Sequence, residues 1–121
     1  GRLDNMIISG GENVYPVEVE SVLERHDVVE EAAIVGRTSE RWNQTVSAFV
    51  TLSTDPAEVD FETAAVALDE HCLRSEELAD FKRPRKYYFI EQFAKSNVGK
   101  ILRKELEKED LDVTVHGVVD I

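Results

Sequence analysis

Lys100 is the residue of this chain best placed to do chemistry. It directly follows Gly99 in the run from Ala94 to Lys104, and an apolar stripe at helical spacing comes next. A glycine frees the backbone for an unusual turn, so we expect Lys100 to stand where a loop enters a short C-terminal helix. Basic residues come early in this helix and acidic residues late, which opposes the helix dipole at a cost of about 0.3–1 kcal/mol per exposed charge. A sequence that departs from such a local preference without an evident compensation often marks a functional site. A solvated, charged terminal helix without a function is the open alternative.

Charge is unevenly distributed along the chain. The 121 residues carry a formal net charge of −11, yet residues 82–104 hold eight basic residues and a single acidic one, Glu91. An acidic body argues against a nucleic-acid partner, because long nucleic acids favour an extended basic face. A confined basic segment suits a small polyanion such as a nucleotide, and a role in solubility alone is the alternative.

Composition excludes further classes of protein. No run of eighteen apolar residues occurs, so neither a transmembrane helix nor a membrane partner is predicted. The single cysteine, Cys72, fits a reducing and hence cytoplasmic location, and its apolar helical face indicates a packing thiol rather than a nucleophile. His26, His71 and His116 are scattered without ligand spacing, so we predict no metal site. Because the chain starts with Gly1 rather than Met, we expect a fragment or an excised domain.

The pattern of strands and helices predicts a small α+β domain, because it lacks the regular βαβ period of a doubly wound sheet. We expect a leading short β-hairpin that turns at Gly10-Gly11, and then about three sheet strands with helices packed on them. The strands are predicted over residues 29–35, 45–52 and 87–90; one helix is predicted to start at Pro16 and another to follow the cap Asp60. The domain is expected to span residues 1–111, with residues 112–121 as a tail that is either disordered or a small strand.

Three segments besides Lys100 offer a surface to a ligand. Gly10 and Gly11 let a ligand approach the backbone closely, although a hairpin turn alone is the simpler explanation. Trp42 lies in a polar loop, where it can either stack on a base or cover the edge of a core. Residues 81–86 place an aromatic ring beside four cations, as a nucleotide site requires.

Several segments, taken in order, resemble the adenylate-forming enzymes. Residues 1–20 are similar to the hinge and tunnel motif of that family, and residues 94–103 are similar to its C-terminal lysine motif. Between them, residues 40–42 and 78–84 resemble the acyl-CoA ligase branch, most closely the 4-chlorobenzoate–CoA ligases. The similarity extends to about Leu106 and covers only the small C-terminal domain of the family.

The resemblance implies an ATP-dependent acid–thiol ligase. In its first step a carboxylate attacks the α-phosphate of ATP, giving an acyl-adenylate and pyrophosphate; in its second, the thiol of coenzyme A displaces AMP. The implied partners are a large N-terminal domain, which holds most of the ATP and carboxylate sites, and a small carboxylic acid. Mg²⁺ is expected in the full enzyme, with no ligands in this chain, and the isolated domain is expected to be inactive.

The resemblance also implies a role for individual residues. Lys100 would be the cation that bridges the carboxylate and the nucleotide, Asp4 the hinge, and Arg2 a contact to the ribose. The tunnel for the pantetheine arm would be lined by Gly10, Gly11, Glu12 and Asn13, and the nucleotide of coenzyme A would be bound by Trp42, Phe81 and Arg83.

Two alternatives stay open at this point. The first is an adenylation domain that loads a carrier protein; Trp42 and the basic segment favour free coenzyme A, because a carrier protein brings its own phosphopantetheine and no adenine. The second is a non-catalytic module that keeps the fold for nucleotide binding or protein contact. The identity of the carboxylic acid is not predicted, since its pocket would lie in the large domain.

Overall fold

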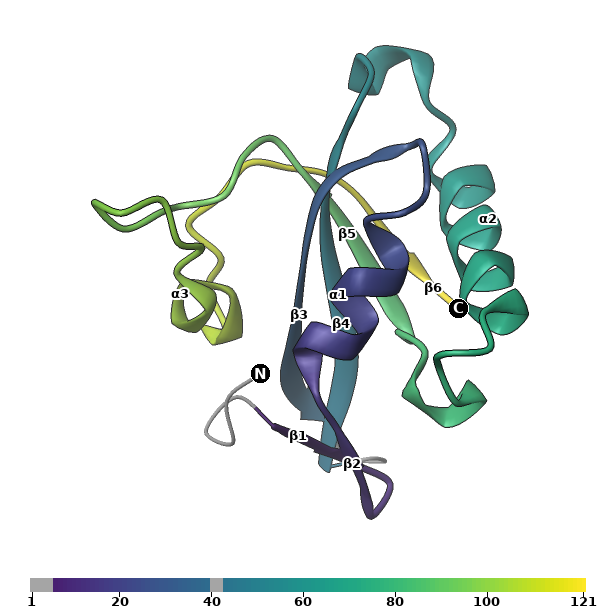
Figure 1. Cartoon of the computed structure of the whole chain (residues 1–121). Coiled ribbons are helices and arrows are strands. Elements are labelled where there is room, and N and C mark those ends of the chain that lie inside the picture. Colours follow the sequence, from purple (N-terminus) through teal and green to yellow (C-terminus); the bar gives the residue numbers. More distant parts are fainter. Residues whose placement is uncertain (1–5, 40–42) are drawn as a thin grey trace.

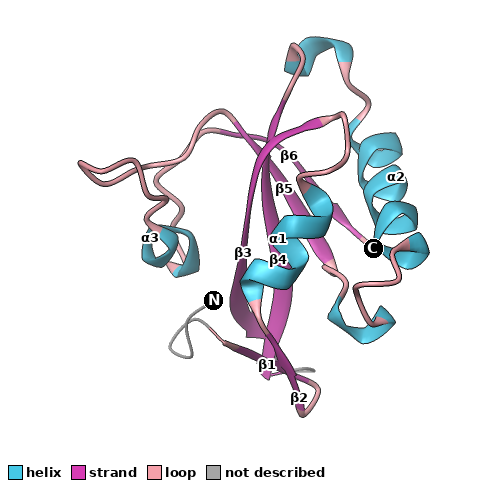
Figure 2. Ribbon diagram, in the orientation of Figure 1, coloured by secondary structure: helices cyan, strands magenta, loops and turns pink. Residues whose placement is uncertain are grey.

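The computed structural model describes residues 6–39 and 43–121. A mixed sheet carries two helices on one face, and a projecting loop with a short third helix lies to one side (Figure 1, Figure 2). The elements in chain order are β1 (Ile7–Ser9), β2 (Glu12–Val14), α1 (Pro16–Leu23), β3 (Val29–Ser39), β4 (Asn43–Leu52), the 3-10 turn η2 (Pro56–Glu58), α2 (Phe61–Arg74), the 3-10 turn η3 (Asp80–Lys82), β5 (Lys86–Ile90), α3 (Arg103–Glu107) and β6 (Val115–Asp120).

The leading hairpin forms as the sequence predicts. Strand β1 pairs antiparallel with β2, with Ser9 opposite Glu12, so Gly10 and Gly11 alone make the turn. Both glycines have positive φ, at 57° and 83°. A two-residue hairpin turn with two positive φ values matches the twist of the flanking strands, and side chains other than those of glycine, Asn or Asp adopt it at a cost.

The main sheet has one more strand than the sequence predicts. Strand β3 pairs antiparallel with β4, β4 pairs parallel with β5, and β5 pairs antiparallel with β6. The α+β class is thus confirmed. Of the two alternatives for the C-terminal residues, the structure has the strand: Gly117 lies opposite Phe89 in the β5–β6 ladder. A short edge strand with a glycine inside it gives a weak sequence signal, which is why the pattern left both options open.

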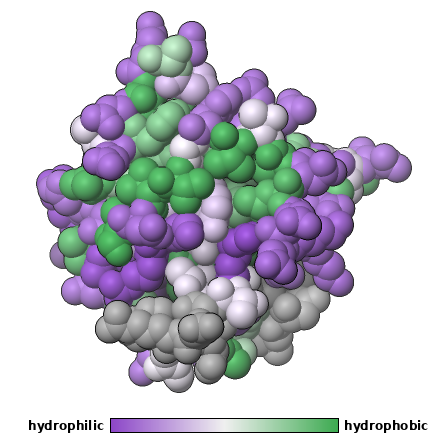
Figure 3. All heavy atoms as spheres, turned by 180° about the vertical axis from the view of Figure 1, so that it is seen from behind, coloured by the Kyte–Doolittle hydropathy of each residue, from purple (hydrophilic) through white to green (hydrophobic). Residues whose placement is uncertain are grey.

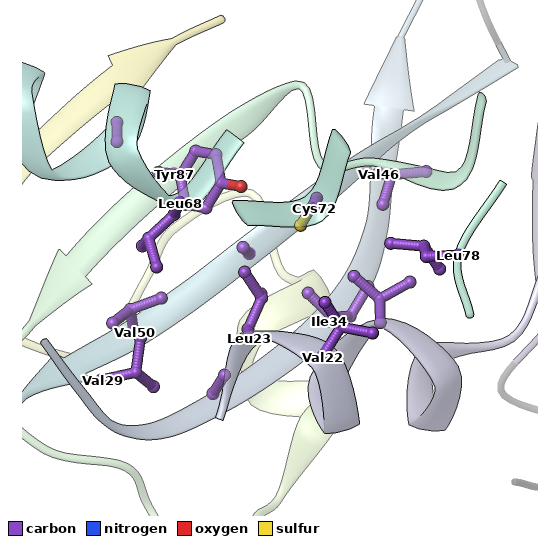
Figure 4. Packing of buried hydrophobic residues seen from close by; sticks show 14 of the residues in the cluster. Val22, Leu23, Val29, Ile34, Val46, Val50, Leu68, Cys72, Leu78 and Tyr87 are labelled. Atoms are coloured by element: carbon purple, nitrogen blue, oxygen red, sulfur yellow. The ribbon is translucent and has the colours of Figure 1, made fainter. Parts of the chain in front are cut away.

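Helices α1 and α2 cover one face of this sheet. Pro16 opens α1, and Asp60 caps α2 by accepting a hydrogen bond from the Glu62 backbone N–H at 3.2 Å. Both helices are amphipathic as predicted, and the cluster of buried side chains between them and the sheet is drawn in Figure 4. Its labelled members are Val22, Leu23, Val29, Ile34, Val46, Val50, Leu68, Cys72, Leu78 and Tyr87.

The other face of the sheet has its own, smaller core. Phe49 and Tyr88 stack there with ring centroids 4.3 Å apart, and Leu106 of α3 packs in the same cluster. Figure 3 views the molecule from behind, and apolar side chains gather on this side while a hydrophilic tip protrudes at its margin. The single buried leucine of α3 therefore fixes this short helix to the sheet.

Helix α1 also covers the open edge of β3. The side chain of Glu20 accepts a hydrogen bond from the backbone N–H of Ile34 at 2.9 Å, and that of Glu24 accepts one from the N–H of Ala32 at 3.2 Å. One turn of helix separates the two glutamates, and two residues separate the two N–H groups, which is the repeat of groups along one strand edge. Two carboxylates therefore occupy donors that an exposed strand edge would leave unpaired.

Candidate functional site: the Lys100 hairpin

Lys100 lies on a projecting hairpin and not at the start of a helix. Lys95 and Ile101 form an antiparallel bridge, and inside it the Ser96 N–H donates to the Lys100 carbonyl at 2.8 Å. Gly99 closes the turn with a φ of 84°, the left-handed conformation that its lack of a Cβ permits. The prediction that Lys100 lies where a loop enters a helix is therefore corrected: α3 begins only at Arg103. We call residues 94–102 the Lys100 hairpin.

The tip of the Lys100 hairpin is open to solvent. The side chain of Val98 is 78% exposed, and Lys100 is exposed as well. Among the described residues, none of the ion pairs includes Lys100. Figure 1 shows this hairpin reaching away from the sheet at the left of the view. The ammonium group of Lys100 is thus available to an anion that comes from outside the domain.

The base of the hairpin is held firmly to the body of the domain. Arg37 of β3 donates hydrogen bonds to the backbone carbonyls of Leu106 at 2.6 Å and Lys108 at 2.9 Å, and so caps the end of α3. Lys95 binds Glu31 of β3 at 2.9 Å. A groove of about 670 Å³ lies between β3 and the hairpin, and Lys100 is part of its lining. The structure thus presents an exposed cation on an anchored support.

The ion pair between Arg103 and Glu20 explains why a basic residue stands at the start of α3, where the helix dipole disfavours it. Arg103 is the first residue of α3, where a cation is unfavourable. Its guanidinium binds the buried carboxylate of Glu20, with Nε and Nη2 donating to the two carboxylate oxygens. The charge is therefore neutralised by a partner 83 positions earlier in the chain.

Most of the basic segment is paired rather than free. With carboxylates of the described residues alone, at least five of its eight cations form ion pairs: Lys82 with Glu18, Arg83 with Asp69, Lys86 with Asp120, Lys95 with Glu31 and Arg103 with Glu20. Four of these acids come from the acidic residues 1–81. The prediction of one basic patch for a polyanion is corrected accordingly, because the opposite charges of the two parts of the sequence meet within the fold.

The other predicted site residues lie at a different end of the molecule. Phe81 is 44% exposed on η3, and the ammonium of Lys82 lies 5.8 Å from the centre of its ring. Lys82 also binds Glu18 at 3.2 Å. Because Glu18 lies in the first turn of α1, just after β2, this ion pair ties η3 to the end of α1 that adjoins the β1–β2 hairpin.

On that hairpin, Gly10 and Gly11 form the turn, and Glu12 and Asn13 are exposed. A Cβ built on Gly11 would meet nothing within 4 Å, so the surface beside this turn is open. Figure 1 places the β1–β2 hairpin at the bottom of the view, well separated from the Lys100 hairpin.

Among the predicted site residues that the structure describes, Arg83 is the least exposed. Its side chain is 15% exposed and binds Asp69 of α2 at 2.5 Å, and its Nε donates to the Asp80 carbonyl at 3.0 Å. Arg2, Asp4 and Trp42 lie outside the described residues.

The sequence interpretation missed the acids that pair with the basic segment. Glu20 lies in the early turns of α1, where an acidic residue is favourable for the helix dipole alone, yet it is buried together with Val19 and Leu23. A signal was present, because Pro16, Glu20 and Leu23 follow one another at i, i+4 and i+7 on a single helical face. Asp69 and Glu31 carried no such signal, since their partners are defined only by the fold.

Three further features of the described residues bear on other possible functions: the thiol of Cys72, the grouping of metal-binding side chains and the length of the helices. Burial raises the pKa of the Cys72 thiol from 9.0 to about 11, the opposite of what a nucleophilic cysteine needs. Within residues 6–39 and 43–121, no group of three or more His, Cys, Asp or Glu side chains could hold a metal ion. No helix in the same ranges is long and apolar enough to cross a bilayer.

Comparison with known proteins agrees with this arrangement. The family model described as AMP-binding enzyme C-terminal domain matches residues 18–100. The chain belongs to this family. The matched range holds β3, β4, β5 and α2 entire, and it ends at Lys100, so this AMP-binding enzyme C-terminal domain carries its exposed lysine at the end of the family pattern.

Three relatives show how far the similarity of this AMP-binding enzyme C-terminal domain reaches. It is 45% identical over 106 residues to a 4-chlorobenzoate–CoA ligase from a Pseudomonas species. The aligned region covers 88% of this chain and 19% of the ligase. It is 42% identical over 107 residues to a fatty acid–[acyl-carrier-protein] ligase, ScoC, from Streptomyces coeruleorubidus, over 87% of this chain and 19% of that enzyme. The structure of the o-succinylbenzoate CoA synthetase MenE from Bacillus subtilis, in complex with its acyl-adenylate intermediate, superposes with a TM-score of 0.75 at 34% identity. That superposition covers 91% of this chain and 21% of MenE. The chain thus spans about a fifth of the length of the relatives it matches.

Proposed function

We propose that this chain is the C-terminal domain of an AMP-forming ligase that joins a small carboxylic acid to coenzyme A. The enzyme would first form an acyl-adenylate from the acid and ATP, and then transfer the acyl group to the thiol with release of AMP. A large N-terminal domain would supply most of the ATP and acid sites, and Mg²⁺ would accompany the ATP phosphates there. The proposal rests on family membership together with the geometry of the Lys100 hairpin.

Lys100 is suited to the first step for an electrostatic reason. A carboxylate that attacks a phosphate brings two anions together, and negative charge builds up on the oxygens around the reacting phosphorus. A cation held close to those oxygens stabilises the transition state more than the separated reactants. Since Lys100 has no ion-pair partner in the described part of this domain, its charge is not already neutralised. It would enter the active site of the N-terminal domain from the tip of its hairpin.

One observation favours two separate roles for the two ends of the domain. The Lys100 hairpin and the β1–β2 hairpin, which holds Gly10 and Gly11, lie well apart on the domain (Figure 1). A single orientation against a partner domain therefore does not present both to one reaction centre. We propose that the domain turns between the two steps, with Lys100 inserted for adenylation and the glycine hairpin guiding the thiol for transfer. Asp4 would act as the hinge and Arg2 would contact the nucleotide.

Free coenzyme A is the proposed acceptor. Phe81 offers an exposed ring beside Lys82, which suits a stacked adenine and a phosphate. Trp42 would supply a second ring, and Glu12 and Asn13 would line the pantetheine arm. Arg83 would bind phosphate only through donors that Asp69 leaves unused. A carrier protein brings no adenine, so the dependence on these rings distinguishes the two acceptors. A cytoplasmic location stays a prediction, which cell fractionation would check.

The proposed role of Lys100 is tested in the intact ligase with Lys100→Ala. ATP–pyrophosphate exchange is expected to fall by about 100-fold or more, the usual effect of removing one transition-state donor. Thioester formation from supplied acyl-adenylate is expected to stay within about twofold. Lys104→Ala, which removes an exposed cation four residues away, is the matched control. Equal losses in both half-reactions would contradict the proposed role.

The acceptor is tested separately, by the dependence of the second step on coenzyme A. Trp42→Ala and Phe81→Ala are expected to raise the KM for coenzyme A about tenfold, since base stacking on an aromatic ring is worth about 1–3 kcal/mol. The pyrophosphate exchange of both variants should stay at the level of the parent enzyme. An unchanged KM for coenzyme A, together with acylation of a carrier protein, would favour the carrier-loading alternative.

A further inference from the structure

Glu20 connects three parts of the domain that lie far apart in the sequence. We propose that Glu20, acting through Arg103, is a positioning residue for Lys100 in the adenylation step. The inference rests on the proposed function of Lys100 and adds the device that would hold its hairpin in place. It concerns residues that touch neither the nucleotide nor the acid.

The carboxylate of Glu20 is enclosed and fully engaged. Glu20 is 8% exposed, and it is the one buried charged residue in the described ranges. Its Oε2 accepts hydrogen bonds from the Ile34 backbone N–H at 2.9 Å and from Arg103 Nε at 3.1 Å. Its Oε1 accepts a hydrogen bond from Arg103 Nη2 at 2.5 Å. Two parallel N–H donors on one carboxylate fix both the position and the direction of the guanidinium.

The support of this carboxylate is itself part of the sheet. Ile34 is buried in the middle of β3, opposite Ala48 of β4 in the ladder, so its N–H cannot move independently. Glu20 is held from its other side by α1, whose Val19 and Leu23 are fully buried. The carboxylate is thereby a fixed point, set by two elements that belong to the main core.

Arg103 is joined to the Lys100 hairpin by a short series of backbone hydrogen bonds, so the position of the arginine fixes that of the hairpin. The adjacent Leu102 N–H donates to the Ala94 carbonyl at 2.9 Å, and Ile101 is bridged to Lys95. These contacts close the base of the Lys100 hairpin directly at the anchored residue. A shift of the arginine would therefore displace both strands of the hairpin together, and Lys100 with them.

The two other contacts near the hairpin, those of Lys95 and Arg37, do not join it to a buried group. Lys95 and Glu31 form an ion pair in which both side chains are more than a third exposed, and such pairs contribute little. Arg37 donates to the backbone carbonyls of Leu106 and Lys108 at the C-terminal end of α3, and so supports the hairpin only indirectly, through the helix. The pair of Glu20 and Arg103 is the only one of the three that joins a buried fixed point to the base of the hairpin.

The experiment uses the intact ligase and measures the two half-reactions separately. Glu20→Gln and Arg103→Gln each remove the fork, that is, the two parallel hydrogen bonds from the Arg103 guanidinium to the Glu20 carboxylate. Glu20→Gln does so with almost no change in side-chain size. Pyrophosphate exchange is expected to fall by about 10–100-fold through kcat, because a misplacement of about 1 Å costs on the order of 100-fold. The KM for ATP and the rate of thioester formation from supplied acyl-adenylate are expected to change less than about twofold. The double variant should lose no more than the worse single variant, since both remove one interaction.

Glu24→Gln is the matched control. Glu24 lies one turn further along α1 and accepts the N–H of Ala32 on the same strand edge, but it does not contact Arg103. Both half-reactions of this variant should equal those of the parent enzyme. Should the Glu20 and Arg103 glutamine variants fail to fold, Arg103→Lys keeps the charge and loses only the fork, and a drop of about fivefold or more in pyrophosphate exchange is then expected.

Three outcomes would overturn the inference. They are an unchanged exchange rate in these variants, a parallel loss in both half-reactions, and independent losses that add in the double variant. Lys100→Ala separates this failure from failure of the proposed function. If Lys100→Ala abolishes exchange and the Glu20 and Arg103 variants do not reduce it, only the positioning role is wrong. If Lys100→Ala itself leaves exchange intact, the proposed function is wrong as well.

Discussion

Arg83, which directly follows η3, forms a largely enclosed ion pair with Asp69 of α2. Their side chains are 15% and 16% exposed, and Arg83 Nη1 donates to Asp69 Oδ1 at 2.5 Å. The pair ties the segment that carries Phe81 to the middle of α2. A residue expected to bind phosphate thus also holds the fold together, so the two roles must be separated by measurement.

Removing one partner of this pair should destabilise the domain. Arg83→Met and Asp69→Asn are each expected to lower the free energy of unfolding by about 2 kcal/mol, because the remaining polar group stays enclosed without its partner. The double variant should lose less than the sum of the two single losses. Urea unfolding followed by circular dichroism measures all three. Additive losses would show that the two side chains do not depend on each other.

Replacing Gly99 with Ala should impair the Lys100 hairpin through the backbone alone. Gly99 has a φ of 84°, and a Cβ added there would meet nothing within 4 Å. The cost is therefore the left-handed conformation itself, about 1–2 kcal/mol, and the turn is expected to rearrange. In the intact ligase, pyrophosphate exchange should fall about tenfold while the second step is spared.

Gly11→Ala provides the comparison for Gly99→Ala. Gly11 has a φ of 83° and equally open surroundings, but it lies on the β1–β2 hairpin. Its substitution should impair thioester formation rather than adenylation. If both variants affected the same half-reaction, the assignment of separate roles to the two hairpins would fail.

Gly117 tests whether β6 is an integral part of the domain. A Cβ at Gly117 would come within 2.6 Å of the ring of Phe61, which is stacked on Phe89 at 5.2 Å between centroids. Gly117→Ala is therefore expected to lower the free energy of unfolding by about 1–3 kcal/mol, as overpacking does. Val118→Thr, on the exposed side of the same strand, should change it by less than about 0.5 kcal/mol. Thermal unfolding that leaves Gly117→Ala at the parent value would argue against the packing of β6 on α2.

Cys72 should make the domain less stable in alkali. Burial raises its pKa from 9.0 to about 11, so between these values the unfolded chain has lost the thiol proton while the folded chain keeps it. The contribution of the buried thiol to stability is then complete below pH 9 and decreases as the pH rises towards 11, in total by at most about 3 kcal/mol. Burial also raises the pKa of Tyr87, which adds to the decrease. In Cys72→Ala, the plot of unfolding free energy against pH should be flatter over this range; an unchanged slope would contradict the raised pKa.

The local structure of this domain follows from residues that are close together in the chain. Gly10 and Gly11 predict a two-residue hairpin turn because few other residues adopt positive φ there, and the apolar stripes of α1 and α2 define their buried faces. Both predictions are confirmed, because propensity, turn geometry and hydrophobic period depend on neighbours in the chain. The resemblance to the adenylate-forming enzymes was likewise readable, and the match of the family model over residues 18–100 confirms it.

The pairing of charges, by contrast, depends on how the chain folds in three dimensions. Five cations of residues 82–104 find acids elsewhere in the fold, and Arg103 finds Glu20 across 83 positions. Ion pairs depend on distances in space, to which sequence spacing gives no guide beyond a helical turn or a hairpin. The same reason explains why Lys100 was expected beside a helix: only the bridge between Lys95 and Ile101 shows that the chain reverses direction before α3 begins.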